Sequence, residues 1–228
     1  MIIELEKIYK SYNNNNLNSM SRNVLEDISL QINSTDSIAI TGPSGCGKST
    51  LLNILGTLDK PDSGIVKIDN EDISRFSEIK SAEIRNRKIG FVFQLHQLLP
   101  QLNLLENILL PTLVLKDNKL RDSAQSRAMD LLEIVGLTDK IKQYPGQLSG
   151  GECQRTAVVR ALINKPEIIL ADEPTGSLDQ ESAEQIGNLL LKINKEQSVA
   201  LVIVTHSMAL AEKMNVIYKL NKGKLETV

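Results

Sequence analysis

The sequence predicts an α/β fold with a mostly parallel β-sheet. Short runs rich in Ile and Val alternate with longer amphipathic stretches, which is the pattern of βαβ units. A glycine-rich motif follows one of these runs and opens a helical stretch, which is the second sign of this fold class. The four clearest strands are predicted at Ser37 to Thr41, Ile89 to Phe93, Glu167 to Ala171 and Val199 to Thr205.

The N-terminal region follows a different pattern. Ile2 to Tyr9 and Val24 to Ile32 alternate between polar and apolar residues, so we expect antiparallel strands with one solvated face. The Asn-rich stretch from Asn13 to Asn18 joins them and is predicted to be a solvated loop. An antiparallel β subdomain is therefore expected near the N-terminus.

Between Leu95 and Lys165 the pattern changes to helical periodicity. Arg121 to Val135 has its apolar residues on one side and stops before Gly136, as an amphipathic helix would. We therefore expect one domain over residues 1–228, with an α-helical subdomain inserted at about residues 95–165.

Composition and charge narrow the classes of function. The chain has 228 residues, with 26 Lys and Arg against 28 Asp and Glu, and a net charge of -2. This balance lacks the basic surplus that a nucleic-acid or anionic lipid surface would attract, so no nucleic-acid partner is expected. No apolar run reaches the roughly 20 residues that span a bilayer, and Met1 to Lys10 lacks a signal-peptide core, so we expect a cytoplasmic protein. The two cysteines are far apart, which excludes a disulfide framework.

The glycine-rich motif runs from Gly42 to Ser49 and fits the pattern G-x-x-x-x-G-K-[ST] of a phosphate-binding loop. It follows an apolar strand and opens the helical run Thr50 to Leu58. Glycines let backbone N–H groups surround phosphate oxygens, and the helix N-terminus adds its positive dipole. Lys48 would reach the β- and γ-phosphates, and Ser49 would bind Mg²⁺. A chance glycine-rich turn is the alternative, which the strand and helix context disfavours.

Two adjacent carboxylates, Asp172 and Glu173, follow the strand predicted at Glu167 to Ala171. The carboxyl end of a parallel strand opens into the crevice where such sheets bind ligands. Asp172 would hold Mg²⁺, directly or through a water, and Glu173 would polarise an attacking water. Without the phosphate loop, the pair would be read as a solvated strand end.

The segment from Leu148 to Glu152 has the sequence LSGGE and resembles the signature motif of ABC-type ATPases. Gln94 after one strand, Ser177 to Asp179 after Glu173, and His206 after another strand match further elements of that family in order. The resemblance covers essentially the whole chain. It implies a P-loop NTPase with a RecA-like parallel core that hydrolyses ATP to ADP and phosphate with Mg²⁺.

The resemblance also implies roles for single residues. Tyr12 would stack on the adenine, although an exposed tyrosine can also be plain surface. Gln94 would contact Mg²⁺ and the attacking water. His206 would hydrogen-bond the γ-phosphate as a neutral imidazole. Asp179 would cross a dimer interface and help to align the water, or it would cap the helix around Glu181.

The signature segment is expected to act on a second chain. Ser149, Gly150 and Gly151 would lie at a helix N-terminus and meet the γ-phosphate that the other subunit binds. One ATP therefore implies two copies of the chain, in a homodimer that closes on ATP and drives a change in integral membrane permeases. The protein would be peripheral, held by the permease at the cytoplasmic face of the inner membrane.

The expected site residues fall into three sets. The nucleotide-contacting set is Tyr12, Gly42, Pro43, Ser44, Gly45, Cys46, Gly47, Lys48, Ser49, Thr50, Gln94, Ser149, Gly150, Gly151, Glu152, Asp179 and His206. The catalytic set is Glu173, His206, Gln94 and Lys48. The metal ligands are Ser49, Gln94 and Asp172.

Three positions depart from the family pattern, namely Cys46, Cys153 and Ser207. None of them removes a phosphate or metal ligand. Because a closed dimer would sandwich one nucleotide, we hypothesise that Cys46 of one subunit approaches Cys153 of the other.

Several segments are similar to the branch that serves permeases with large extracytoplasmic domains. Among them are Leu55 to Asp59, Pro61 to Gly64 and Ile89 to Pro100. The LHQLLP run and Leu210 to Met214 are most similar to the ATPase of lipoprotein-releasing complexes. Leu95 to Leu105 lies where the family docks a permease, but its leucines could equally form the core of the helical subdomain.

Other functions of the same family stay open at the level of sequence. The ATPase of a macrolide, peptide or antibiotic exporter, or of a cell-division permease, would share every catalytic residue. A soluble ABC ATPase of translation or DNA repair usually has two fused nucleotide domains or a long coiled-coil insertion, and this chain has neither.

Overall fold

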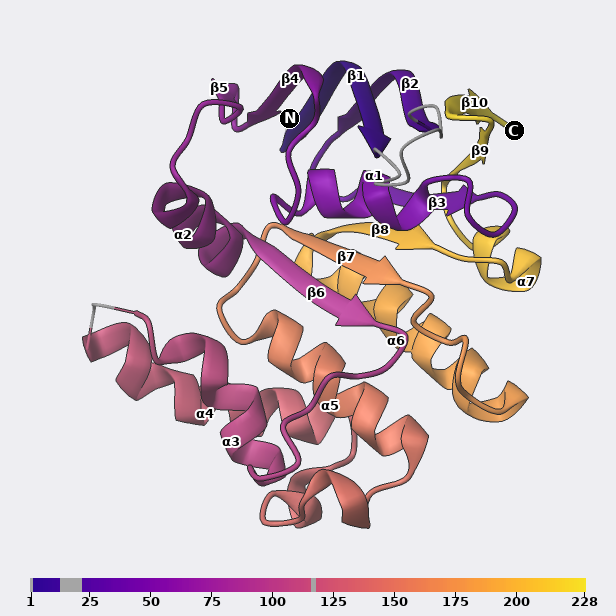
Figure 1. The fold of residues 1–228 in the computed structure, drawn as a ribbon. Helices are drawn as coiled ribbons and strands as arrows, with labels where there is room; N and C mark the ends of the chain where they lie inside the picture. Colours follow the sequence, from indigo (N-terminus) through magenta and orange to yellow (C-terminus); the bar gives the residue numbers. More distant parts are fainter. Residues whose placement is uncertain (1, 13–21, 116–117) are drawn as a thin grey trace, which may run out of the picture.

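The computed structural model describes residues 2–12, 22–115 and 118–228, which form two β-sheets and a group of helices. Figure 1 shows the antiparallel sheet at one end, the parallel sheet in the middle and most helices on the far side of it. The predicted loop at Asn13 to Asn18 lies outside the described residues. Among the described residues, no helix is both long enough and apolar enough to cross a bilayer.

The central sheet has six strands in the order β10-β9-β3-β8-β7-β6. All neighbouring strands in it are parallel except the terminal hairpin of β9 and β10. The strands are β3 (Ser37–Thr41), β6 (Ile89–Phe93), β7 (Ile168–Asp172), β8 (Ala200–Val204), β9 (Val216–Asn221) and β10 (Lys224–Thr227). The expectation of a mostly parallel sheet is confirmed.

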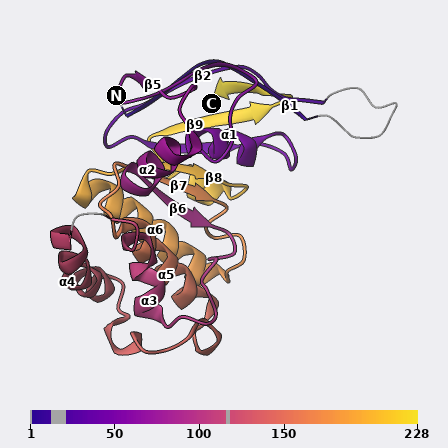
Figure 2. The same ribbon diagram turned by 60° about the vertical axis from the view of Figure 1, so that its left-hand side comes forward.

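The second sheet is antiparallel, with the order β2-β1-β4-β5. Its strands are β1 (Ile3–Tyr12), β2 (Arg22–Ile32), β4 (Ser63–Ile68) and β5 (Glu71–Asp72). In Figure 2 this sheet lies above α1, and β1 and β2 extend sideways together. The expected antiparallel β subdomain is therefore present, and β4 and β5 enlarge it.

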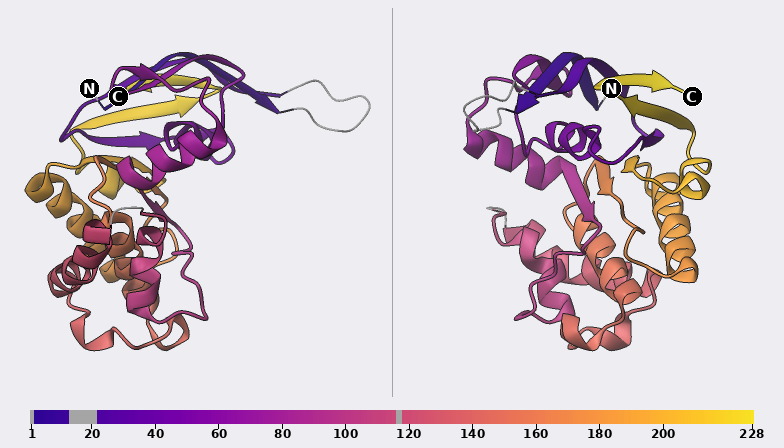
Figure 3. Two further views of the ribbon diagram at one scale, coloured as in Figure 1. Left: turned by 90° about the vertical axis from the view of Figure 1, so that its left-hand side faces the viewer. Right: turned by 45° about the vertical axis from the view of Figure 1, so that its right-hand side comes forward.

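The helices are α1 (Lys48–Leu55), α2 (Glu78–Lys88), α3 (Leu104–Leu109), α4 (Asn118–Ile134), α5 (Gly150–Leu162), α6 (Gln180–Gln197) and α7 (Met208–Ala211). Short 3-10 turns occur at Leu110–Thr112, Thr138–Lys140 and Pro145–Gln147. Both views of Figure 3 show α1 between the two sheets and α3 to α5 in the lower part of the molecule. Helices and turns thus make up most of the described residues between 104 and 165.

The parallel sheet is buried on both faces, and β8 shows how. Ala200, Val202 and Val204 pack into the core that α1 and the antiparallel sheet complete. Leu201 and Ile203 point to the opposite face and pack against α5 and α6. Because side chains alternate along a strand, a strand that is covered on both faces must be apolar throughout, which is the pattern of its sequence.

The register of the sheet brings four strand ends to one edge. Asp172 at the end of β7 pairs with Phe93 of β6 and Val204 of β8, and Val204 pairs with Ile40 of β3. The residues that follow these strands therefore emerge side by side, as the crevice of an open α/β sheet requires. They include the glycine-rich loop after β3 and Glu173 after β7.

Candidate active site

The loop after β3 closes tightly around the Lys48 side chain. Gly42 and Gly47 have φ of 150° and 108°, which side chains rarely allow, and a Cβ at Gly42 would lie 2.2 Å from the Leu220 carbonyl oxygen. Lys48 is buried, and its Nζ donates to the carbonyl oxygens of Gly42 and Pro43 at 2.9 and 3.1 Å. The lysine is therefore held in the centre of the loop by the loop's own backbone.

Helix α1 begins directly behind this loop without a side-chain cap. Its N-cap is Gly47, which has no side chain that could accept an N–H, and no acidic residue lies in the first turn. The first N–H groups of the helix are thus left for another acceptor, and a phosphate is the acceptor such a terminus prefers. A cavity of about 380 Å³ lies over this turn and is lined by Tyr12, Val24, Gly45, Gly47, Lys48, Ser49 and Thr50.

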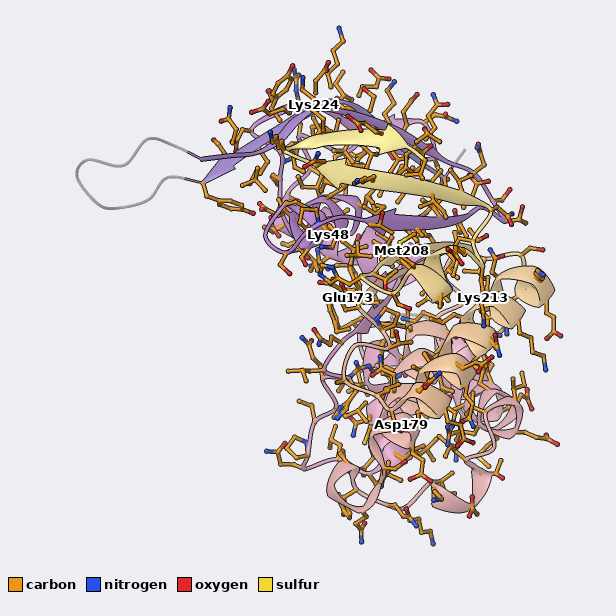
Figure 4. The ribbon with its side chains drawn as sticks, turned by 90° about the vertical axis from the view of Figure 1, so that its right-hand side faces the viewer. Lys48, Glu173, Asp179, Met208, Lys213 and Lys224 are labelled. Atoms are coloured by element: carbon orange, nitrogen blue, oxygen red, sulfur yellow. The ribbon has the colours of Figure 1, made fainter. Side chains whose placement is uncertain are left out.

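Lys48, Glu173 and His206 come together as one group, which we call the phosphate-loop cluster. Lys48 Nζ lies 3.2 Å from His206 Nε2, and Glu173 Oε1 lies 3.3 Å from the same nitrogen. The backbone N–H of His206 donates to Glu173 Oε2 at 3.1 Å. Since the lysine ammonium has only donors, Nε2 can accept from Lys48 only in the tautomer that carries its proton on Nδ1. Figure 4 labels Lys48 and Glu173 at this junction of sheet and helices.

The backbone conformation of Glu173 sets the direction of its side chain. It follows β7 with φ of 46°, a left-handed conformation that is uncommon for a glutamate, and its N–H donates to the Val204 carbonyl oxygen at 2.9 Å. Its Oε1 is buried and accepts no hydrogen bond within the described chain. A buried carboxylate oxygen without a donor is a position where a water molecule would be bound.

The three predicted metal ligands lie around the same sheet edge. Ser49 is exposed in the first turn of α1, Asp172 ends β7, and Gln94 follows β6. Ser177 Oγ donates to the Gln94 carbonyl oxygen at 2.9 Å and holds that segment against the turn after Glu173. Hydroxyl, amide and carboxylate oxygens suit Mg²⁺, which usually keeps waters and substrate phosphates as its other ligands. Within the described residues, no group of three or more His, Cys, Asp or Glu could hold a metal by itself.

The signature segment forms a second group, the signature cluster, made of Ser149, Gly150, Gly151 and Asp179. Ser149 caps α5, because its Oγ accepts from the Glu152 N–H at 3.2 Å. Glu152 returns the contact, accepting from the Ser149 N–H at 2.8 Å, and forms an ion pair with Lys140. The Lys140 hydrogen bond and then the Ser149 N–H lower the pKa of Glu152.

Asp179 belongs to this second group. It caps α6 by accepting the Ser182 N–H at 2.9 Å, and this backbone hydrogen bond is the main cause that lowers the pKa of Asp179. A Cβ on Gly151 would lie 3.1 Å from Ser182 Oγ, so the signature segment packs beside the start of α6. Figure 4 places Asp179 on the helical side, apart from Lys48 and Glu173. Within a single chain, Asp179 therefore acts as the cap of α6.

The leucines between Leu95 and Leu105 divide between the two interpretations. Leu98 and Leu104 are buried in apolar clusters, as core residues are. Leu95 is 71% exposed and Leu99 is 43% exposed, as a docking surface requires. The segment thus serves both as core and as surface.

The cysteine hypothesis, which concerns a closed dimer, gains no support from the surroundings of Cys153 in the single chain. Cys153 is only 3% exposed and packs with Leu98 and Ala157, and its Sγ lies 3.6 Å from the Pro145 carbonyl oxygen. A thiol inside the chain presents no surface to Cys46 of another subunit. Burial also raises the pKa of Cys153, which disfavours the reactive thiolate.

Two side chains that sequence reasoning missed hold the Gln94 segment. Gln154 is 1% exposed and donates from Nε2 to the Phe93 carbonyl oxygen at 2.9 Å. Arg160 donates to the carbonyl oxygens of His96 and Gln97 at 2.7 and 2.6 Å. Both residues lie on α5, so the signature helix also fixes the loop after β6. The sequence feature that could have pointed to them is a polar residue on the buried side of a predicted helix.

Comparison with known proteins connects this geometry with a family. A family model for ABC transporters matches residues 25–176. The lipoprotein-releasing system ATP-binding protein LolD of Legionella pneumophila (strain Paris) is 45% identical over 226 residues, covering 99% of this chain and 97% of that protein. LolD 1 of Rhodopirellula baltica is 48% identical over 202 residues, covering 89% of this chain and 87% of that protein.

Solved structures agree with the family model. The dimeric structure of MJ0796, a bacterial ABC transporter cassette, is 39% identical with a TM-score of 0.86, covering 99% of this chain and 98% of that one. A dimeric post-hydrolysis state of the ATP-binding cassette MJ0796, bound to ADP and Pi, is 38% identical with a TM-score of 0.85 at the same coverage. The chain therefore belongs to the ABC transporter family and has the fold of its ATP-binding cassettes.

Proposed function

We propose that this chain is the ATP-hydrolysing subunit of a lipoprotein-releasing ABC transporter and works with Mg²⁺. The observation that carries the hydrolytic part is the phosphate-loop cluster, in which Lys48, Glu173 and His206 meet beside an uncapped helix N-terminus. The transporter assignment rests on full-length similarity to proteins named for lipoprotein release.

Glu173 is the general base of this proposal. As a water oxygen attacks the γ-phosphorus, the free Oε1 accepts the water's proton and the bond to the bridging oxygen of ADP breaks. The His206 N–H on Oε2 keeps the carboxylate in that orientation. The buried position of Oε1 supports the assignment, because that oxygen has no other donor among the described residues.

Lys48 and His206 stabilise the charge that develops on the γ-phosphate. In the structure Lys48 donates to loop carbonyls and to His206, contacts that an arriving phosphate would replace with charge-assisted ones. Ser49, Gln94 and Asp172 would hold Mg²⁺, which supplies a further positive charge when bound.

The active form in this proposal is a homodimer. Asp179 of the signature cluster lies on the helical side of its own chain, apart from Lys48 and Glu173 (Figure 4), so the cluster is suited to a nucleotide held by another copy. Two of the similar solved structures are dimers. Residues 95–165 would act as a helical subdomain that carries the signature, and Asp179 would face the partner while it caps α6.

The permease is proposed to dock next to the Gln94 segment. A largely apolar cavity of about 600 Å³ opens there, and its lining includes Phe91, Phe93, Gln97, Val114 and Arg160. Exposed Leu95 and Leu99 follow the same segment. Binding at this place would hold the protein at the cytoplasmic face of the inner membrane.

Purification from native membranes tests the whole proposal. Tagged Glu173→Gln protein, bound to ATP and Mg²⁺, should bring down integral permease subunits together with lipoproteins, identified by mass spectrometry. Lys48→Ala protein in the same medium controls for nucleotide-independent binding. Recovery of a single exporter-type permease would replace the lipoprotein assignment, and recovery of no membrane protein would overturn the transporter assignment.

A further inference from the structure

The hydroxyl of Tyr12 is anchored to a residue on a different element. Tyr12 ends β1 and lines the cavity over the phosphate loop, and its side chain is 46% exposed. Its hydroxyl donates to Asp59 Oδ2 at 2.8 Å. Burial of the phenol is the main cause that raises the pKa of Tyr12, so the ring stays neutral at physiological pH. Holding an exposed ring in one place costs side-chain entropy, and this hydrogen bond offsets that cost.

Both carboxylate oxygens of Asp59 accept hydrogen bonds from the groups around them. Its Oδ1 accepts from Lys10 Nζ at 2.8 Å and from the Lys60 N–H at 2.7 Å, which leaves Oδ2 to the tyrosine. Lys10 is mostly buried, with an exposed fraction of 11%, and also donates to the Lys60 carbonyl oxygen. Its ammonium lies over the Tyr12 ring, 5.3 Å from the centroid.

A second aspartate fastens the same strand end. Asp62 Oδ2 accepts from the N–H and the hydroxyl of Ser11 at 2.7 and 2.8 Å. The Asp62 N–H donates to the Tyr9 carbonyl oxygen at 2.9 Å. The last residues of β1 are thus bound to the segment after α1 on both sides of Lys10.

That segment is in turn continuous with α1. The N–H groups of Leu58 and Asp59 donate to the Asn53 carbonyl oxygen at 2.8 and 3.2 Å, so Asp59 is fixed to the last turn of the helix. The first turn of the same helix follows the phosphate loop at Gly47. One short helix therefore carries the phosphate-binding terminus at one end and the anchor of Tyr12 at the other.

We propose that Asp59, supported by Lys10, is a positioning residue for the nucleotide base. It holds the Tyr12 ring at a set place relative to α1, so that a base stacks on the ring while the phosphates lie on the loop. Lys10 covers one face of the ring and leaves the other for the base. This inference rests on the proposed binding of ATP and adds the part of the site that recognises the base.

Binding of ATP and of inorganic tripolyphosphate, each with Mg²⁺, separates this role from a structural one. We expect Asp59→Ala to weaken ATP binding about tenfold, which corresponds to about 1.4 kcal/mol, while tripolyphosphate binding stays unchanged because it has no base. Asp59→Asn keeps an oxygen acceptor for the tyrosine, so it should weaken ATP binding less than Asp59→Ala does. In hydrolysis assays the KM for ATP should rise, with kcat at saturating ATP preserved.

A double-mutant cycle and a control complete the test. Tyr12→Phe keeps the ring but lacks the hydroxyl, and Asp59→Ala lacks the acceptor, so their losses of ATP affinity should be less than additive. Glu71→Ala removes an acid of the same sheet that pairs with Lys80 and should change neither affinity. Equal weakening of ATP and tripolyphosphate by Asp59→Ala and Asp59→Asn, or additive losses in the cycle, would overturn the inference. Wild-type protein that binds neither ligand would instead refute the proposed function.

Discussion

Two helix N-termini in this molecule differ in whether side chains cap them. Helix α1 begins at Gly47 with no side-chain cap and no acidic residue in its first turn. Helix α5 begins at Ser149 with a reciprocal cap, in which Ser149 and Glu152 satisfy each other's N–H groups. The first terminus has open N–H donors and a buried lysine beside it, whereas the second is stable as it stands.

The difference indicates how one nucleotide site is divided. An uncapped terminus is costly unless a ligand completes it, which suits the phosphate loop of the same chain. A capped terminus keeps its shape without a ligand, which suits a segment that must wait for the nucleotide of a partner. We therefore expect damage near α1 to abolish binding or chemistry, and damage near α5 to act only in the assembled dimer.

The largest effect should come from Glu173→Gln. Removal of the general base should slow ATP hydrolysis by about 10²- to 10⁴-fold, while ATP still binds and the dimer remains closed. Single-turnover hydrolysis and size-exclusion chromatography with ATP measure the two properties. Glu167→Gln changes an acid just before the other end of β7 and is the matched control. Near wild-type turnover in Glu173→Gln would remove Glu173 from its role.

Lys48→Ala should act on binding as well as on chemistry. Loss of the buried ammonium should weaken ATP binding about 100-fold, as expected for a charge-assisted contact. Equilibrium titration with a fluorescent ATP analogue measures this change. Lys213→Ala, a surface lysine labelled in Figure 4, should leave the affinity as it is. Unchanged affinity in Lys48→Ala would contradict the assignment of the phosphate loop.

Ser149→Ala sharpens the comparison from the other side. Loss of the cap should lower the free energy of unfolding by about 1 kcal/mol. Ser77→Ala removes a comparable cap from α2 and should cost a similar amount. Hydrolysis at saturating ATP should fall only in Ser149→Ala, whereas ATP binding by the monomer should be kept in both. If the two variants hydrolysed ATP equally fast, Ser149 would be a cap and nothing more.

The smallest effect concerns pH. The folded-state pKa of Glu152 lies below the usual value of 4.5, so its contribution to stability is present above pH 4.5 and is lost as the pH falls through the folded pKa. Lys140→Met removes the largest cause of that shift. The drop in melting temperature between pH 7 and about pH 4 should therefore be smaller in this variant than in the wild type. An identical drop would show that the Lys140 contact does not stabilise the capped terminus.

Strand positions could be predicted closely, whereas the start of helix α1 could not. The bounds of β3 and β6 agree with the prediction, because buried parallel strands are apolar from end to end. Helix α1 begins at Lys48, earlier than the run predicted from Thr50, whereas α5 begins at Gly150, where the signature segment predicts a helix N-terminus. The cause is local, since the left-handed Gly47 starts α1 before its apolar periodicity begins.

The site was predictable where its residues are near in sequence or follow neighbouring strands. Lys48 lies within one contiguous motif, and Glu173 and His206 follow strands whose carboxyl ends share an edge. The contact between Lys10 and Asp59 joins residues 49 positions apart and depends on how β1 lies against the segment after α1. Periodicity carries no information on that placement, so Asp59 received no role from the sequence.

Complementation between two inactive variants tests most directly whether the two termini serve one site across two chains. Lys48→Ala has an intact signature cluster, and Ser149→Arg has an intact phosphate-loop cluster, so each should be inactive alone. Mixing them should restore ATP hydrolysis, because a mixed dimer contains one site with both halves intact. Wild-type hydrolysis by Ser149→Arg alone, or a mixture no more active than the sum of its parts, would contradict the account.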